Sequence, residues 1–201
     1  MTTEMPGRPA PSGTPRICLF GGTFDPVHLG HTAAAELALR QLGLDQVRFL
    51  PCRISPHKLG SRSAAAEHRL AMLELALHGI GWARIDRFDL DQPEPSYSWR
   101  TVLAMREQFP EARLFWLLGG DQWDDLPDWS RADLLAGTLE FIVVRRGPPP
   151  GPRPGWTCHP LDAVHPASAT RIRDSAPAGL RTDWLAPEVA TYIRRHHLYG
   201  A

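Results

Sequence analysis

Apolar and polar positions alternate along the chain in a rhythm that predicts strands and helices in turn. Short apolar runs have the length of buried strands, and the segments between them carry apolar residues at helical spacing. Strands are expected at residues 16–20, 46–51, 82–86, 113–118 and 139–145. Helices are expected at residues 30–42, 64–78, 98–109, 130–135 and 187–196. This alternation is typical of a parallel sheet whose strands are joined by helices.

The most continuous apolar runs lie at residues 114–118 and 141–144. Central strands of a parallel sheet are buried on both faces, so they lack polar alternation. We therefore expect an α/β fold with a doubly wound parallel sheet, in a single domain that spans residues 16–201. Residues 1–15 are rich in Pro, Gly, Ser and Thr, which predicts a disordered leader. Residues 147–155 include eight Gly or Pro and are expected to form an irregular surface loop.

Charge and cysteine content narrow the class of protein. The 201 residues include 22 basic and 22 acidic side chains, so net charge favours neither nucleic acid nor an anionic membrane as a partner. The three cysteines are far apart and have no metal-ligand spacing. No run approaches the roughly 20 apolar residues of a membrane span, and no secretory signal is recognisable. These features favour a cytoplasmic protein in which any anionic ligand is bound by a local site.

The turn after the first expected strand carries Gly-Gly-Thr-Phe-Asp-Pro-Val-His-Leu-Gly-His at residues 21–31. Ligands of a doubly wound sheet bind beyond the carboxyl ends of its strands, where this turn lies. The start of the following helix attracts phosphate, and Gly21 and Gly22 allow close approach of the backbone. His28 and His31 share a helical face and can donate hydrogen bonds to phosphate oxygens. The alternative is that both histidines only cap and pack the helix.

This turn matches neither of two common phosphate-binding patterns, because it lacks the Lys-Ser/Thr ending of a Walker A loop and the Gly-x-Gly-x-x-Gly of dinucleotide-binding turns. It resembles the motif of the T/HxGH nucleotidyltransferase superfamily, in the version found in bacterial nicotinate-nucleotide adenylyltransferases. The resemblance runs from about residue 16 to residue 199. It implies a Rossmann-like fold and Mg²⁺-dependent transfer of AMP from ATP to nicotinate mononucleotide. The products would be nicotinate adenine dinucleotide and pyrophosphate, as part of NAD biosynthesis.

Two further segments add cationic groups. Pro-His-Lys at residues 56–58 follows the second strand and resembles the family's P-P-H-K segment, with Ser55 in place of the first proline. Lys58 is a mobile point charge that can follow a phosphate. Ser-Ala-Thr-Arg-Ile-Arg at residues 168–173 resembles the family's S-S-T-x-I-R. Its hydroxyls and helix start, with the guanidinium of Arg173, form a second candidate anion site.

Three segments resemble the family's acceptor and nucleoside contacts. Ser-Tyr-Ser at residues 96–98 is similar to the S-Y-T element, but residues 99–101 read Trp-Arg-Thr where the family usually continues with an acidic residue. Gly-Gly-Asp at residues 119–121 resembles the family's G-x-D. Leu-Pro-Asp-Trp at residues 126–129 resembles L-x-x-W, and an indole can stack on a pyridine ring. The basic residue in the 99–101 segment leaves the identity of the acceptor open.

The resemblance implies a role for each matched residue. Catalysis would rest on His28, His31, Lys58 and Arg173. ATP would be bound by Gly21, Gly22, Thr23, Phe24, His28, Gly30, His31, Gly119, Asp121, Ser168, Thr170 and Arg173. The acceptor would be bound by Asp25, His57, Lys58, Tyr97, Ser98 and Trp129. Mg²⁺ would be held mainly by phosphates of ATP and by water, so no metal site made of protein ligands is expected.

Three alternatives stay open. A sister transferase would use nicotinamide mononucleotide or another phosphorylated acceptor. A nucleotide-binding regulator would bind ATP without turnover, although intact His28, Gly30 and His31 argue against it. An RNA-binding α/β module has little support, because no basic patch or interleaved aromatic strand motif is present.

Overall fold

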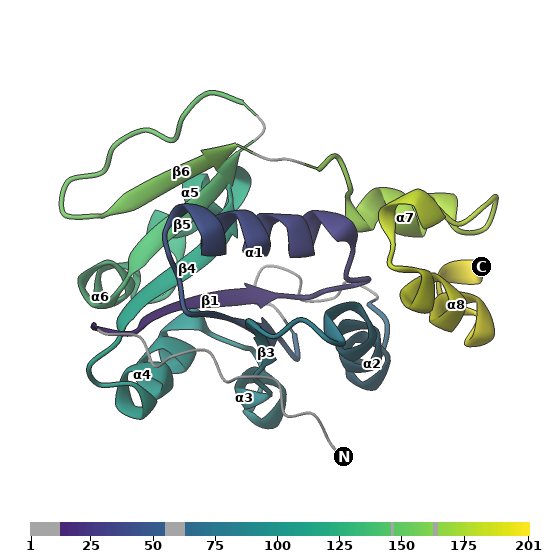
Figure 1. Ribbon diagram of the computed structural model, residues 1–201, viewed down its shortest axis with the longest axis horizontal. Coiled ribbons are helices and arrows are strands. Elements are labelled where there is room, and N and C mark those ends of the chain that lie inside the picture. The colour runs from purple at the N-terminus through teal and green to yellow at the C-terminus, as the bar shows by residue number, and fades with distance from the viewer. Residues whose placement is uncertain (1–12, 55–62, 146, 163–164) are drawn as a thin grey trace, which may run out of the picture.

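The computed structural model describes residues 13–54, 63–145, 147–162 and 165–201, and it shows one sheet between two layers of helices (Figure 1). The strand order is β3-β2-β1-β4-β5-β6, and neighbouring strands are parallel throughout. The strands are β1 (Arg16–Gly22), β2 (Gln46–Pro51), β3 (Ala83–Ile85), β4 (Arg113–Gly119), β5 (Glu140–Arg145) and β6 (Cys158–Asp162). The order reverses between β1 and β4, so their carboxyl ends flank the switch point at which such sheets bind ligands.

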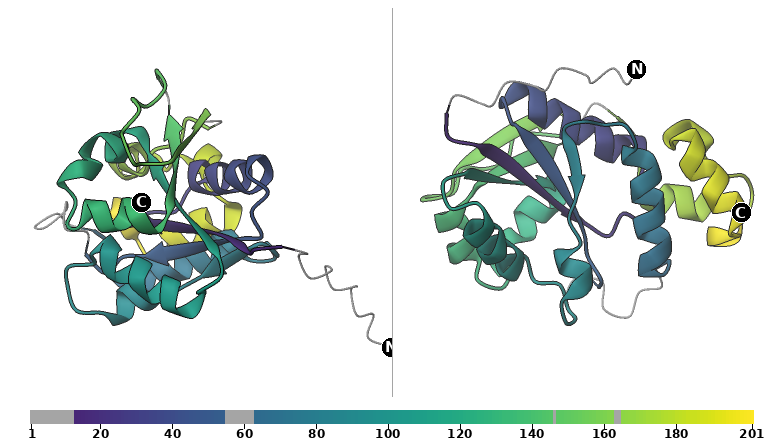
Figure 2. Two further views of the ribbon diagram at one scale, coloured as in Figure 1. Left: turned by 90° about the vertical axis from the view of Figure 1, so that its left-hand side faces the viewer. Right: turned by 60° about the horizontal axis from the view of Figure 1, so that its bottom comes forward.

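Helices cover both faces of the sheet, as two further views show (Figure 2). They are α1 (Leu29–Gln41), α2 (Ala66–Leu77), α3 (Phe88–Asp91), α4 (Ser98–Gln108), α5 (Gly120–Asp125), α6 (Ala132–Thr138), α7 (Ala169–Ser175) and α8 (Pro187–Arg195). Short 3-10 turns lie at Leu126–Asp128, Thr182–Trp184 and Leu198–Gly200. Buried side chains of α1, α2, α7 and α8 form the core on one face. Those of α4, α5 and α6 form the core on the other face.

Strand β1 shows how the sheet separates these two cores. Cys18 and Phe20 belong to the core under α1 and α2, whereas Ile17 and Leu19 belong to the core under α4. Successive side chains of a strand point to opposite faces, so an uninterrupted apolar run fills both cores. The doubly wound parallel sheet expected from the sequence is therefore confirmed.

Each expected strand and helix is present within a few residues of its expected bounds, and residues 147–155 form neither helix nor strand, as expected. Strand β6 and helices α3 and α5 were not expected. In β6 only Leu161 is buried, and Pro160 is tolerated because β6 is an edge strand. Residues 1–12 of the expected leader lie outside the described residues. Within the described ranges, no helix is long and apolar enough to cross a membrane.

Candidate active site

A cavity of about 1010 Å³ opens at the carboxyl ends of β1 and β4. Most of the residues singled out in the sequence line it: Gly21, Gly22, Thr23, Phe24, Asp25, His28, Gly30, His31, Tyr97, Ser98, Gly119, Asp121, Trp129 and Arg173. Ser168 and Thr170 are not among its lining residues, and His57 and Lys58 fall outside the described residues. The fold thus brings segments from the start, the middle and the end of the chain to one cavity.

Three glycines of the 21–31 turn lie against neighbouring rings, and a Cβ on Gly22 would lie 3.0 Å from the ring of Phe24. A Cβ on Gly21 would lie 2.7 Å from the indole of Trp116, and a Cβ on Gly30 would lie 3.0 Å from the ring of His28. None of the three has a positive φ; the residue with a left-handed backbone in this turn is Phe24 (φ 49°). These glycines are therefore needed for close packing and not for unusual dihedral angles.

His28 and His31 form a stacked pair at the start of α1. Their ring centroids are 3.7 Å apart and their planes differ by 17°, and His28 is only 8% exposed. The backbone N–H of His28 donates to Nδ1 of His31 at 3.2 Å. Because Nδ1 accepts, the proton of the neutral His31 ring is on Nε2. The ring of Phe24 packs edge-on against His31 at 5.1 Å and keeps this imidazole in place.

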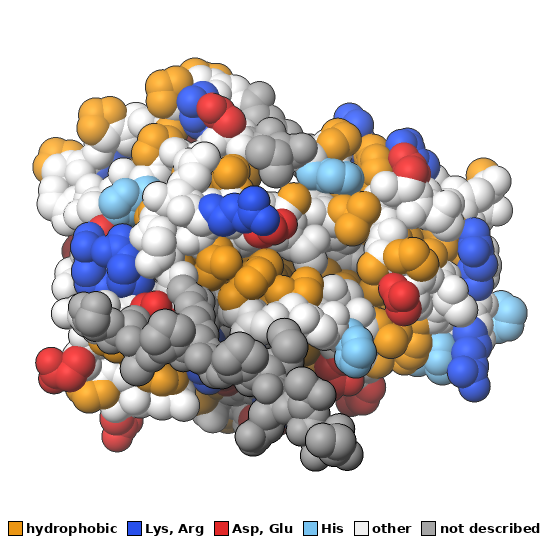
Figure 3. Space-filling model, in the orientation of Figure 1, with side chains coloured by type: hydrophobic (Ala, Val, Ile, Leu, Met, Phe, Trp, Pro, Cys, Tyr) orange, Lys and Arg blue, Asp and Glu red, His pale blue; other side chains and the backbone are white. Residues whose placement is uncertain are grey.

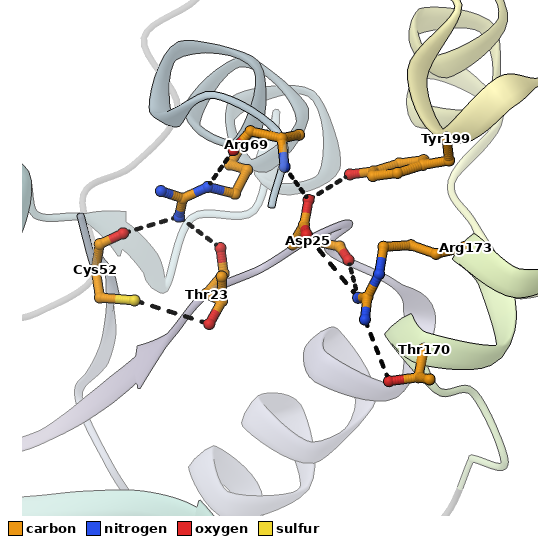
Figure 4. Close-up of polar contacts among 8 residues, drawn as sticks. Thr23, Asp25, Cys52, Arg69, Thr170, Arg173 and Tyr199 are labelled. Atoms are coloured by element: carbon orange, nitrogen blue, oxygen red, sulfur yellow. Dashed lines mark hydrogen bonds and ion pairs between the residues drawn. The ribbon is translucent and has the colours of Figure 1, made fainter. Parts of the chain in front are cut away.

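Asp25 is a buried carboxylate, 4% exposed, whose contacts come from three distant segments (Figure 4). Its Oδ1 accepts from the hydroxyl of Tyr199 at 2.7 Å and from the backbone N–H of Ala64 at 3.1 Å. The guanidinium of Arg173 donates to its backbone carbonyl at 2.6 Å and lies 3.9 Å from Oδ2. Asp25 lines the cavity, but these contacts tie its carboxylate to the protein; a role in acceptor binding stays a prediction.

Arg69 of α2 is almost fully buried, and within the described residues its side chain donates to four backbone carbonyls. Nη1 reaches Thr23 and Cys52 at 2.8 Å each, Nη2 reaches Arg53 at 2.9 Å, and Nε reaches Ala64 at 3.0 Å. One cation therefore joins the ends of β1 and β2 to the start of α2, and Figure 4 shows it beside Thr23 and Cys52. Charged donors form the stronger class of hydrogen bond, so this arrangement fixes the edge of the cavity.

Arg173 lies one turn into α7 and faces the 21–31 turn. Besides its contacts with Asp25, its Nη2 is 3.4 Å from the hydroxyl of Thr170. Ser168 is the N-cap residue of α7, and its carbonyl accepts from the N–H of Ile172 at 3.0 Å. Of the predicted 168–173 anion site, the structure places Arg173 in the cavity lining, whereas Ser168 and Thr170 lie at the start of α7 and are not among the lining residues.

On the opposite side of the cavity, Asp89 of α3 is buried and pairs with α4. Its carboxyl accepts from the hydroxyl of Thr101 at 2.5 Å. Burial raises the pKa of Asp89 to about 6, and the nearby charge of Asp86 acts in the same direction, while the Thr101 hydrogen bond opposes both. The carbonyl of Asp89 also accepts from Ser96, next to Tyr97 and Ser98 in the lining. A protonatable carboxyl thus lies in this wall.

The sequence departure at residues 99–101 does not reach the cavity. The guanidinium of Arg100 lies 5.1 Å from the ring centroid of Tyr97 and 5.4 Å from that of Trp99, and it donates to the carbonyl of Pro93. Neither Trp99 nor Arg100 is among the lining residues. The basic side chain that made the acceptor uncertain is therefore packed on the rings of Trp99 and of Tyr97, and of these three residues only Tyr97 lines the cavity.

The turn after β4 is more open than the turn after β1. A Cβ on Gly119 or Gly120 would meet nothing within 4 Å, and Asp121 is exposed. Trp129 follows the 3-10 turn and packs partly against the core under α4. Trp123, by contrast, is fully buried against Phe141 and is part of the core.

Sequence reasoning missed several residues of the site: Arg69, Asp89, His165 and Tyr199. Arg69 occupies the buried stripe of α2 together with Met72 and Leu73, and a charge at such a position is a signal that could have been used. Tyr199 lies beyond the last long helix and its partner is 174 residues away, so no local pattern indicates its contact.

Comparison with known proteins places the chain in a family. The family model described as cytidylyltransferase-like matches residues 19–175. The nicotinate-nucleotide adenylyltransferase of Bacillus subtilis is 34% identical over 192 residues, which covers 92% of this chain and 98% of that protein. A probable nicotinate-nucleotide adenylyltransferase of Gloeobacter violaceus is 37% identical, in an alignment that covers 92% of this chain and 96% of that protein. The chain belongs to the nicotinate-nucleotide adenylyltransferase family.

Solved structures agree with this family at the level of the fold. Plasmodium falciparum nicotinic acid mononucleotide adenylyltransferase, complexed with NaAD, matches with a TM-score of 0.76 at 17% identity and covers 92% of this chain and 98% of that one. A putative nicotinate-nucleotide adenylyltransferase from Vibrio parahaemolyticus matches with a TM-score of 0.64 over 92% of this chain and 96% of its own. The family resemblance and the Rossmann-like fold expected from the sequence are confirmed.

Proposed function

We propose that this protein transfers AMP from ATP to nicotinate mononucleotide and releases nicotinate adenine dinucleotide and pyrophosphate in NAD biosynthesis. The observation that carries the proposal is the stacked pair of His28 and His31 beside Arg173, in a cavity at the switch point of the sheet. Two relatives that are 34% identical to this chain over 192 residues are named for that reaction.

In this reaction an oxygen of the acceptor phosphate attacks the α-phosphorus of ATP. The new P–O bond forms as the bond from the α-phosphorus to the bridging oxygen breaks, and the electron pair leaves on pyrophosphate. No protein nucleophile is required, because catalysis of this kind rests on positioning and charge stabilisation. Nε2–H of His31 would donate to the phosphate at which charge builds up, and Arg173 would bind the departing charge.

The charge of the cavity lining fits a nucleotide that binds together with Mg²⁺. The described lining holds six aspartates and two arginines, so free ATP would meet net negative charge. The described residues include no group of three or more His, Cys, Asp or Glu side chains arranged so that it could hold a metal ion. We therefore propose that Mg²⁺ arrives bound to the phosphates and keeps several waters, where it neutralises phosphate charge.

A cytoplasmic location is also proposed, as is the absence of a nucleic-acid partner. All three cysteines lie in the described residues and none forms a disulfide, as suits a reducing compartment. On the face of the molecule in Figure 3, Lys and Arg side chains are scattered among acidic and apolar ones. On this face such a distribution gives no electrostatic footprint for a phosphate backbone, and the balance of 22 basic and 22 acidic side chains gives no net positive charge.

The decisive experiment compares acceptors on the purified protein. Pyrophosphate release from ATP and Mg²⁺ is measured with nicotinate mononucleotide and with nicotinamide mononucleotide. We expect a clear preference for the acid, since Arg100 and Trp99 lie outside the cavity lining. A preference for the amide would move the protein to the sister activity. ATP binding without release of pyrophosphate with either acceptor would instead favour a regulatory role.

A further inference from the structure

The end of the chain folds back onto the catalytic turn. Helix α8 is anchored by the buried side chains of Val189, Ala190 and Ile193, and the backbone beyond it takes left-handed conformations at His197 (φ 50°) and Tyr199 (φ 60°). Non-glycine residues rarely adopt this conformation and tend to do so where function requires it. Here it places the hydroxyl of Tyr199 2.7 Å from Oδ1 of Asp25.

The direction of this hydrogen bond is settled by the surroundings. Burial, and then the negative charge of Asp25, raise the pKa of Tyr199 well above its usual value. The phenol therefore stays protonated and donates, and the carboxylate accepts. The backbone N–H of Ala64 donates to the same oxygen at 3.1 Å. Both neutral donors thus converge on Oδ1, and Oδ2 is left turned toward Arg173.

Arg173 is the group that this arrangement orients. Its Nη1 donates to the carbonyl of Asp25 at 2.6 Å and lies 3.9 Å from Oδ2, while Nη2 is 3.4 Å from Thr170. The guanidinium is therefore held from two sides at the cavity wall. If the carboxylate of Asp25 rotated, the separation of 3.9 Å would shorten or lengthen, and Arg173 would change its position relative to a bound phosphate.

We propose that Tyr199 is a positioning residue of the active site, which acts through Asp25 to hold Arg173 in place for the departing phosphates. The proposal rests on the proposed adenylyl transfer. The 3-10 turn at Leu198–Gly200 thereby gains a role in the reaction. Because this turn is far in sequence from residues 21–31, the sequence alone does not indicate that role. Tyr199 itself touches no reacting atom; its effect requires that Arg173 be present.

Tyr199→Phe removes a single hydroxyl, and Tyr192→Phe is the matched control. Tyr192 lies on α8 and its hydroxyl bonds Nδ1 of His68 at 3.0 Å, away from the cavity. For Tyr199→Phe we expect kcat to fall about tenfold with little change in the KM for ATP, because a less firmly held Arg173 stabilises the charge on the departing phosphates less well in the transition state. Tyr192→Phe is expected to keep kcat. Rates are normalised to the folded fraction, measured by circular dichroism in the same samples.

A double-mutant cycle separates positioning from a loss of stability. In an Arg173→Ala background, Tyr199→Phe should change kcat by less than about twofold, since its effect passes through the missing guanidinium. Equal losses in both backgrounds, or a kcat of the single variant within about twofold of the parent, would overturn the proposal.

Binding of a non-hydrolysable ATP analogue keeps this test separate from the proposed function. Parent protein that binds the analogue yet transfers no AMP would contradict the proposed function alone. The affinity for pyrophosphate, the departing group, would then decide the positioning role. Tyr199→Phe should weaken this affinity when Arg173 is present and leave it unchanged in the Arg173→Ala background, and equal losses in both backgrounds would overturn the role. Parent protein that binds no nucleotide would overturn both.

Discussion

The two walls of the cavity are built in different ways. The histidine wall comprises residues 21–31 and Arg173, and residues 21–31 are held by the buried Arg69 of α2 and by the partly buried Tyr199 near the end of the chain. The tryptophan wall comprises Asp89, residues 96–98 and residues 119–130. It has open space around Gly119 and Gly120 and an exposed Asp121. Rigidity is thus concentrated on the side where charge is expected to develop, as pre-organised electrostatic stabilisation requires.

One glycine from each wall shows the same difference between tight packing and open space. Gly21 is needed because the indole of Trp116 occupies the space of a Cβ, whereas a Cβ on Gly120 would meet nothing within 4 Å. One glycine belongs to a packed edge and the other to an open turn. The same residue type therefore marks tight packing on one wall and room for a ligand on the other.

The largest expected effect comes from removing the cation that holds the histidine wall. Arg69→Met should lower the free energy of unfolding by about 4 kcal/mol, because four backbone carbonyls lose the charged donor of an almost fully buried side chain. Urea denaturation measures this change. Arg106→Met is the control, since Arg106 also donates to carbonyls but is only half-buried and lies outside the cavity lining. A loss no greater than that of the control would show that the wall does not depend on Arg69.

The tryptophan wall is tested through the effect of Asp89 on the free energy of unfolding at different pH values. Its pKa in the folded protein, about 6, is above the ordinary 3.8, so its stabilising contribution is complete below about pH 4 and is lost as pH rises through 6. Asp89→Asn has no such titration. The stability of this variant relative to the parent should therefore rise between pH 4 and pH 7, by up to about 3 kcal/mol. Urea denaturation at several pH values measures the gap, and a gap that is constant with pH would contradict the assignment.

Chemistry on the histidine wall is tested by His31→Ala. Loss of one donor to a developing charge costs on the order of 100-fold in kcat, or about 2.7 kcal/mol of activation free energy. The melting temperature should change little. His78→Ala, at an exposed position after α2, serves as the control. A soluble His31→Ala protein with nearly parental rate would remove this residue from the mechanism.

The smallest effects come from the paired glycine variants. Gly21→Ala should cost about 2 kcal/mol of unfolding free energy, because the buried indole of Trp116 must shift. Gly120→Ala should stay within about 0.5 kcal/mol of the parent, since its Cβ would point into open space. Thermal unfolding of both proteins measures the difference. Equal costs would mean that the two turns are packed alike.

The sequence was sufficient for features that depend on neighbouring residues. Apolar runs predicted the central strands because both faces of those strands are buried, and the 21–31 turn was recognisable because its glycines and histidines are close together in the chain. Strand β6 escaped prediction because an edge position tolerates Pro160 and requires only one buried side chain.

Long-range contacts could not be predicted in the same way. Arg69 reaches Thr23 across 46 positions, and Tyr199 reaches Asp25 across 174. The family resemblance implies that Asp25 binds the acceptor, and this role stays a prediction. Nothing in its local sequence indicates that three distant segments surround its carboxylate. Such contacts depend on the tertiary fold, and a single sequence carries no periodic pattern that reports them.

The contact between Tyr199 and Asp25 also has a consequence for the order of synthesis. During translation the first strand and its turn leave the ribosome long before residue 199 is made, and domains generally fold as whole units. The 21–31 turn therefore gains the hydrogen bond from Tyr199 only after the chain has been extended by 174 residues beyond Asp25. A nascent chain that is released early would carry both histidines and still lack the group that holds Asp25.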